Sequence, residues 1–343
     1  MSTSAPSILR RVVRGAAVLA VSMSGAARAE APATMSAVRM HEFGPPSVMR
    51  VEEVPTPRPA AGEILVRVRA AGVNPVDWKV RSGQIRQFAS TLPYTPGYDI
   101  CGVVESVGEG VTAFAPGDEV MAYMALTRGG GYAQYAVLPA TEAAKKPASM
   151  EHAAAAGLPL AGLTAWQALV DTAKLDKGQT VLIHGAAGGV GHLAVQIARS
   201  RGARVIATAS ERNLEFVRSL GADVVVDYRA QKFEEVASDV DVVLDTVGGE
   251  TGERSIGVLK PGGIIVSIVG MPDQARCKER GVRGTAILVR PDGRQLAALG
   301  ALADEGALRC EVGATMPLAE AARAHELSEG GKTPRGKIVL TVD

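Results

Sequence analysis

The chain has 343 residues, of which 47% are apolar and 21% are charged, and its formal net charge is +1. This composition is typical of a globular protein that is long enough for two average domains. The near balance of acids and bases excludes the strongly basic surface of nucleic-acid-binding proteins. Three cysteines, none in C-x-x-C spacing, exclude a disulfide framework and a four-cysteine zinc site.

Residues 1–29 are predicted to form a signal peptide. Arginines precede an apolar run of small residues at about 15–27, and Ala27-Arg28-Ala29 offers an A-x-A cleavage motif before Glu30. The run is too short to span a bilayer as a helix, so no stable membrane span is expected.

Two other interpretations of this leader stay open. The segment is rich in serine and arginine and lacks acids, as mitochondrial presequences do, and Met35 fits an alternative start. The Arg10-Arg11 pair also allows export by the twin-arginine route. We expect a periplasmic or exported protein if the leader is a signal. Otherwise we expect a cytoplasmic protein, or a mitochondrial one in a eukaryote.

Residues 35–157 are predicted to form a β-rich, barrel-like domain. Short apolar runs alternate with glycine and proline turns such as Pro116-Gly117-Asp118, and closely spaced short strands are typical of barrels. The expected strands cover residues 63–68, 101–107, 120–124 and 132–138.

Residues 158–291 are predicted to form an α/β domain with a doubly wound parallel sheet of the Rossmann type. Apolar strands alternate with amphipathic helices, and repeated βαβ units build a parallel sheet with helices on both faces. Residues 292–343 contain a helix and a last strand at 337–342, which we expect to return to the first domain and complete it. The expected strands of the α/β domain cover residues 180–184, 204–208, 224–226, 240–244 and 264–269.

A glycine-rich turn lies between the strand at 180–184 and the helix after it. Glycines permit a tight turn and let the backbone approach a pyrophosphate, which the N–H groups and dipole of the helix N-terminus attract. No Lys-Ser or Lys-Thr follows the last glycine, which disfavours a Walker-type loop. The predicted dinucleotide-binding residues are Gly185, Ala187, Gly188, Gly189, Val190 and Gly191.

The next strand predicts NADPH rather than NADH as the cofactor. NAD sites usually carry Asp or Glu at the end of this strand, roughly 20 residues past the glycines, to bind the ribose hydroxyls. Here Ser210 can donate a hydrogen bond to a 2′-phosphate, and Arg212 can pair with it. Tyr228, past the following strand, could add a hydroxyl, whereas Glu211 would repel the phosphate if it pointed inward.

Several strings in fixed order identify a family likeness. The chain from Met35 onward resembles the zinc-free quinone oxidoreductase and zeta-crystallin branch of the medium-chain dehydrogenase/reductases. This resemblance implies a GroES-like catalytic barrel and a Rossmann domain, with NADPH in the cleft between them. The strings are Ala71-Gly72-Val73-Asn74-Pro75-Val76-Asp77, Pro96-Gly97-Tyr98-Asp99, Leu160-Ala161-Gly162-Leu163-Thr164-Ala165, the glycine turn, Asp245-Thr246-Val247-Gly248-Gly249 and Gly336-Lys337.

The resemblance also implies positions for individual residues. Asn74 would lie near the nicotinamide, and Thr164 would contact the cofactor near the same end. Asp245, Thr246 and Val247 would run past its ribose, Gly270 would close on it, and Lys337 would reach back from the last strand.

The chain departs from the zinc alcohol dehydrogenases of the same superfamily. Those enzymes have a cysteine where this chain has Asn74, and a Gly-His-Glu string where it has Gly97-Tyr98-Asp99. A catalytic zinc needs three protein ligands, which neither Cys101 nor the five histidines supply. We therefore expect no metal.

The reaction implied by the resemblance is hydride transfer from NADPH to a quinone or another α,β-unsaturated carbonyl compound. Asn74 is the candidate hydrogen-bond donor to the substrate oxygen. Tyr98 and Tyr132 are candidate proton donors, although a tyrosine beside glycine is more often a packed turn residue. Asp77 and Lys79 are expected to form a surface or structural pair.

Two alternative functions stay open. The chain could be an NADPH-binding sensor or structural protein with little turnover, as some lens crystallins of this family are, or an enoyl-thioester reductase. We also expect a homodimer, because the apolar stretch 284–289 matches a family strand that pairs across a dimer.

Overall fold

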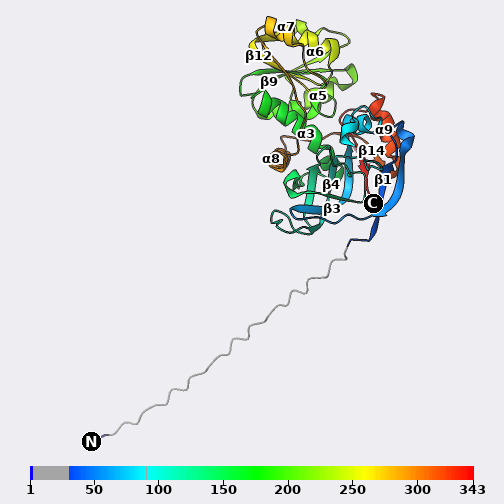
Figure 1. The fold of residues 1–343 in the computed structure, drawn as a ribbon. Coiled ribbons are helices and arrows are strands. Elements are labelled where there is room, and N and C mark those ends of the chain that lie inside the picture. The colour runs from blue at the N-terminus through cyan, green and yellow to red at the C-terminus, as the bar shows by residue number, and fades with distance from the viewer. Residues whose placement is uncertain (3–30, 90) are drawn as a thin grey trace. The chain divides into compact units, whose positions relative to one another are not determined.

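The structure is a computed structural model that describes residues 1–2, 31–89 and 91–343. The signal peptide predicted for residues 1–29 lies outside the described residues, apart from its first two. Residues Pro32–Asp343 form one compact unit, in which a β-rich lobe and an α/β lobe can be followed in Figure 1. No helix within the described ranges combines the length and the apolar character needed to cross a membrane.

The β-rich lobe is built around a seven-stranded sheet with the order β14-β15-β3-β4-β5-β7, in which β6 also pairs with β3. Strands β1 and β2 form a separate antiparallel hairpin that precedes β3 in the chain. The strands are β1 (Thr34–Met40), β2 (Met49–Pro55), β3 (Glu63–Val73), β4 (Asp99–Val107), β5 (Glu119–Tyr123), β6 (Tyr135–Pro139), β7 (Ala143–Lys145), β14 (Val312–Pro317) and β15 (Lys337–Thr341). Helix α1 (Pro75–Arg81) connects β3 to β4, α9 (Ala321–Glu329) connects β14 to β15, and α2 (His152–Gly157) follows β7.

Strand β15 brings the C-terminus back into this first lobe. It runs antiparallel to β3, with Leu340 opposite Ala71. Along β3, Ile64, Val66 and Val68 all point into one apolar cluster, as the two-residue period of a strand requires. The fold thus places Lys337, at the start of β15, beside residues that lie far away in sequence.

The α/β lobe contains a six-stranded, fully parallel sheet with the order β10-β9-β8-β11-β12-β13. Its strands are β8 (Thr180–Ile183), β9 (Arg204–Ala209), β10 (Val224–Asp227), β11 (Val240–Asp245), β12 (Leu259–Ser267) and β13 (Arg283–Ala286). Its helices are α4 (Gly191–Ser200), α5 (Leu214–Ser219), α6 (Gly249–Ser255) and α7 (Gln274–Glu279). Helices α3 (Pro159–Trp166) and α8 (Gly293–Asp304) lie where the two lobes meet (Figure 1).

Both faces of the parallel sheet are buried, as a doubly wound fold requires. Val181 and Val205 share a cluster with Leu193 of α4 and Phe216 of α5. The alternate residues of the same strands share a second cluster with Cys277 of α7: Leu182, Ile206, Val243 and Ile265. Because successive strand residues point to opposite faces, these strands are apolar throughout, and the predicted α/β class is confirmed.

The strand order reverses between β8 and β11. The chain passes from β8 to β9 and β10 on one side, then returns to β11 on the other side of β8. The loops after β8 and β11 therefore diverge and leave a crevice at the carboxyl end of the sheet. Open α/β sheets bind their ligands in such a crevice.

Candidate active site

The glycine turn fills the start of this crevice. Gly185 has a positive φ of 61°, and its carbonyl accepts a hydrogen bond from Gly188 N–H at 2.9 Å. A Cβ at Gly191 would lie 2.3 Å from the Gly185 carbonyl oxygen and 2.7 Å from Ala186 Cα, both backbone atoms. Only glycine at position 191 lets the helix approach the strand this closely, so the turn has the geometry of a phosphate-binding loop.

His192 of α4 ties the turn to a distant segment. Its Nε2 accepts from the Glu311 backbone N–H at 3.1 Å, so its Nδ1–H donates to the Gly188 carbonyl at 2.8 Å. Burial lowers the pKa of His192 to about 4, and the ring is therefore neutral at neutral pH. This histidine fixes the backbone of the turn.

His184 supports the turn from the other side. The Ser255 hydroxyl donates to the Thr251 carbonyl, so it accepts from His184 Nε2 at 2.8 Å. The Thr208 hydroxyl then donates to Nδ1 at 3.1 Å. Burial lowers the pKa of His184 to about 4, which keeps this chain of hydrogen bonds neutral.

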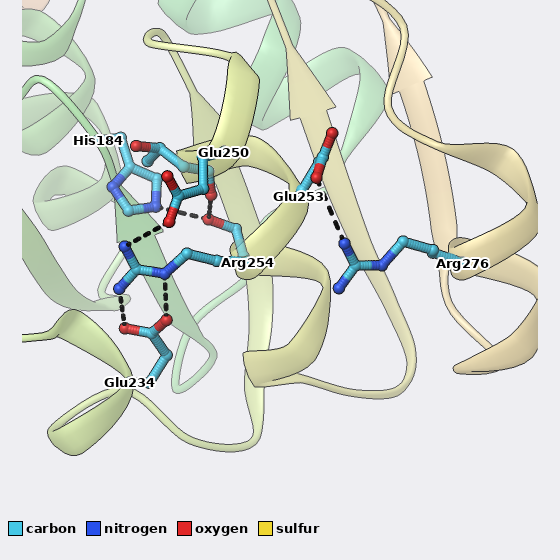
Figure 2. Close-up of polar contacts among 8 residues, drawn as sticks. His184, Glu234, Glu250, Glu253, Arg254 and Arg276 are labelled. Atoms are coloured by element: carbon cyan, nitrogen blue, oxygen red, sulfur yellow. Dashed lines mark hydrogen bonds and ion pairs between the residues drawn. The ribbon is translucent and has the colours of Figure 1, made fainter.

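Figure 2 shows the ion pairs on α6 beside this histidine. Arg254 donates to both carboxylate oxygens of Glu234, at 2.6 and 2.7 Å, and Glu250 lies on its other side (Figure 2). The same guanidinium lies 4.9 Å from the centroid of the Phe233 ring, which packs in a T-shaped arrangement against the His184 ring with the ring centroids 4.8 Å apart. α6 and the turn are thus held together by one continuous set of contacts.

A cavity of about 570 Å³ opens from the glycine turn toward the β-rich lobe. One end is lined by the turn, by Thr246 after β11 and by Ile268 after β12. The other end is lined by α1, the segment after it and the segment after β13. Its walls comprise Asn74, Pro75, Val76, Lys79, Ile85, Gln87, Phe88, Tyr123, Leu126, Leu160, Ala161, Thr164, Gly185, Gly188, Gly189, Val190, Gly191, Thr246, Ile268, Val269, Ile287, Leu288, Val289 and Lys337.

Where the two ends meet, Asn74 is held in one orientation. It is 2% exposed, and its Nδ2 donates to Asp99 Oδ2 at 2.8 Å, while its Oδ1 accepts from Lys337 Nζ. Because an acid faces the amide nitrogen and a cation faces the amide oxygen, the side chain cannot flip. Nδ2 carries a second hydrogen, which none of these contacts uses.

Two buried acids surround this amide. Burial raises the pKa of Asp99 to about 6, against the opposing effects of Lys337 and Asn74. Burial raises the pKa of Asp77 to about 7, although Asp77 accepts a hydrogen bond from the Asn74 backbone N–H at 2.6 Å. Lys337 Nζ lies 3.7 Å from Asp99 Oδ2, so its charge is balanced by an acid.

The residues predicted to choose NADPH lie at one edge of the sheet. β9 and β10 pair so that Asp227 is opposite Ala209, which brings Tyr228 beside Ser210 at the carboxyl ends of both strands. Arg212 and Glu211 follow and are exposed. Tyr228 is 55% exposed, and none of these four side chains lines the cavity.

Of the residues after β11 and β12 that were expected near the cofactor, some line the cavity and others do not. Thr246 lines the cavity and donates to the His184 carbonyl at 2.8 Å. Asp245 is buried and accepts from the Val247 and Gly248 N–H groups at 3.0 and 2.8 Å, so it shapes the loop. Val247 and Gly270 are exposed and do not line the cavity, nor does Ala187.

Three expectations about the β-rich lobe need correction. Tyr98 and Tyr132 are fully buried and do not line the cavity. Tyr98 accepts from the Tyr94 hydroxyl at 3.0 Å, and the Tyr132 hydroxyl is 3.3 Å from His325 Nε2 inside the barrel. Burial raises the pKa of both phenols, and neither side chain reaches the cavity in which a substrate would be protonated. Asp77 and Lys79 form no pair, because Asp77 is buried against Asn74 and Lys79 lines the cavity.

Comparisons with known proteins agree with this architecture. The family model "Alcohol dehydrogenase GroES-like domain" matches residues 60–148, and "Zinc-binding dehydrogenase" matches residues 220–340. A quinone oxidoreductase from Sus scrofa is 36% identical over 324 residues, which cover 89% of this chain and 97% of that protein. The solved quinone oxidoreductase of Coxiella burnetii is 37% identical, with a TM-score of 0.84 over 90% of this chain and all of the other. The Escherichia coli quinone oxidoreductase, solved with NADPH, is 29% identical, with a TM-score of 0.79 over 90% of this chain and all of the other.

The chain belongs to the quinone oxidoreductase branch of the medium-chain dehydrogenase/reductases. It is therefore an oxidoreductase with the two-domain fold of that superfamily. One family model carries zinc in its description, yet the described residues contain no group of three His, Cys, Asp or Glu side chains that could hold a metal. At the cavity, the side chains around Asn74 are an amide, an ammonium group and a carboxyl group, which is not a zinc ligand set.

Several cavity residues of this oxidoreductase were missed from the sequence. The apolar wall comes from α1, the segment after it and the segment after β13, which have no motif in common. Tyr123 lines the cavity and donates to the Val289 carbonyl at 3.3 Å, a contact across 166 residues. Lys79 gave a local signal, since it lies five residues past Asn74 on the helix that follows the matching string.

Proposed function

We propose that this oxidoreductase transfers a hydride from NADPH to a quinone or another α,β-unsaturated carbonyl compound, without a metal ion. The observation that carries the proposal is a cavity whose lining includes the phosphate-binding turn, Asn74 and an apolar chamber. A dinucleotide laid on the turn would present its nicotinamide near Asn74 and Thr164. A flat, apolar acceptor fits the chamber beyond them.

When bound, the dinucleotide would supply the hydride, and the chain would supply position and charge. The N–H groups of the turn would bind the pyrophosphate. Asn74, oriented by Asp99 and Lys337, lines the cavity, and its remaining Nδ2 hydrogen can donate to a substrate oxygen. The apolar wall excludes water from the reacting carbon, which strengthens these interactions.

The choice of NADPH rests on Ser210, Arg212 and Tyr228. They gather at the carboxyl ends of β9 and β10, where the 2′ position of an adenosine ribose would lie. No acid in the described part of the chain forms an ion pair with Arg212, so its guanidinium is available for a phosphate, and Ser210 precedes the short helical turn that carries Arg212. The E. coli relative solved with NADPH supports the same cofactor.

Turnover by the full-length chain tests the proposal. NADPH and NADH oxidation would be followed with benzoquinone, a simple enone, an enoyl-thioester and an aldehyde. We expect oxidation of NADPH with the quinone or enone and little with the aldehyde. Tight NADPH binding without turnover on any acceptor would instead favour the sensor or structural role, and preference for the thioester would favour an enoyl-thioester reductase.

Two further expectations stand as proposals. We propose that β13, the edge strand of the parallel sheet, pairs with its copy in a homodimer. We also propose that residues 1–29 are an export signal, which N-terminal sequencing of the protein recovered from the periplasm or medium would test.

A further inference from the structure

The chamber beyond Asn74 is apolar but contains one distinctive charge. Its walls are mainly aliphatic or aromatic: Val76, Ile85, Phe88, Leu126, Leu288 and Val289. The polar side chains that reach the same space are Lys79, Gln87 and Tyr123. Whether a polar group can stabilise a negative charge on a substrate depends on the hydrogen-bond and ion-pair partners that it already has.

Most polar groups along the cavity are already engaged. The Thr164 hydroxyl donates to the Leu160 carbonyl at 2.7 Å, and the Tyr123 hydroxyl donates to the Val289 carbonyl. Lys337 donates to Asn74 and lies beside the acid Asp99. A negative charge on a substrate would therefore gain little from these groups, because their hydrogens or charges are already compensated.

Lys79 differs from Lys337 in this respect. Its ammonium lies 5.7 Å from the centroid of the Trp78 ring, and no acid within the described ranges lies at ion-pair distance from it. A ring face attracts the cation without neutralising it. A substrate that fills the chamber would remove water from this ammonium, which strengthens its attraction for any negative charge placed beside it.

The proposed reaction creates such a charge. The C4–H bond of the dihydronicotinamide breaks, and a new C–H bond forms at the electron-poor carbon of the acceptor. The acceptor gains two electrons, its conjugated π electrons move onto the carbonyl oxygen, and water then supplies a proton to that oxygen or to the adjacent carbon.

We propose that Lys79 is a catalytic residue that stabilises the negative oxygen formed on the acceptor during hydride transfer. The inference rests on the proposed function, and it adds a role for the α1 lysine that the family resemblance does not assign. Stabilisation is larger in the transition state than in the bound substrate, because the neutral substrate does not carry this charge. Lys79 therefore acts on kcat rather than on NADPH binding.

The first test compares wild type, Lys79→Met and Lys79→Arg with a neutral enone and with the same enone carrying a carboxylate. Lys145→Met serves as the control, because Lys145 is exposed on β7 and does not line the cavity. We expect Lys79→Met to lower kcat for the neutral enone by roughly 10²-fold with the NADPH affinity unchanged, and Lys79→Arg to keep most of the activity. If Lys79→Met changes only KM, and only for the carboxylate substrate, Lys79 recognises a substituent and the proposal is refuted.

A second test does not depend on turnover. 4-Nitrophenol mimics the phenolic product, and its phenolate absorbs at longer wavelength than the neutral phenol. We expect NADP⁺-loaded wild type to increase the phenolate fraction of the bound ligand, and Lys79→Met to lose this increase. Equal spectra for both proteins, or no spectral change in either, would overturn the proposal. Absent turnover of every acceptor by wild type would contradict the proposed function alone, because the spectra still decide the role of Lys79.

Discussion

The buried carboxyl group of Asp77 should make the stability of this protein depend on pH. Asp77 is fully buried, and its Oδ2 accepts a hydrogen bond from the Asn74 backbone N–H. Burial raises its pKa from 3.8 to about 7. The folded state then binds more protons than the unfolded state between these values, so the free energy of unfolding falls as pH rises through this window.

The size of the effect follows from the shift. A rise in the pKa of Asp77 from 3.8 to about 7 corresponds to a loss of about 4 kcal/mol in the free energy of unfolding between about pH 4 and pH 7. Asp77→Asn keeps the shape and an oxygen that can accept from Asn74, but it cannot ionise. The variant should therefore match wild type near pH 4 and exceed its stability by up to about 4 kcal/mol near pH 7.

Urea unfolding followed by tryptophan fluorescence across this pH range would measure the difference between the two proteins. Subtracting wild type from variant cancels the titrating groups that lie far from Asp77, whereas Asp99 is coupled to Asp77 and shifts the pKa of Asp77 in the same direction as burial. Asp239→Asn is the control, since it makes the same replacement at an exposed position. A difference for Asp77→Asn that stays constant from pH 4 to 7 would refute the reasoning.

Three further predictions concern the cofactor and the assembly. Gly191→Ala places a Cβ against the Gly185 carbonyl and should weaken NADPH binding at least about tenfold and lower the free energy of unfolding by about 1–3 kcal/mol. Gly257→Ala is the control, because its Cβ would have nothing within 4 Å. A fluorescence titration with NADPH measures the affinity of both variants, and urea unfolding measures their stability. Arg212→Ala should weaken NADPH binding about tenfold and leave NADH unaffected, with Arg218→Ala as the control; equal losses for both nucleotides would contradict the assigned role. Sedimentation should give a dimer through β13, and a monomer at micromolar concentration would remove that proposal.

The sequence by itself determined the features that depend on neighbours along the chain. The apolar runs of β8, β9 and β11 are buried on both faces, and this gives them a continuous pattern that is readable without a structure. The glycine turn was equally readable, because positive φ at Gly185 and close approach at Gly191 are requirements of the local backbone. Residue period and glycine spacing act over a few residues, so sequence reasoning reaches them.

Only the tertiary structure decided which side chains share the cavity. Asn74 and Lys337 lie 263 residues apart, and only the return of β15 beside β3 brings them into contact. Tyr98 has the same local pattern of turn and strand that suggested a proton donor, yet β-barrel packing turns it into the core. Lys79 looked like a surface residue, until the segment after β13 closed the apolar chamber around it. Burial, charge balance and access to a cavity are sums over distant contacts, and the local sequence contains none of them.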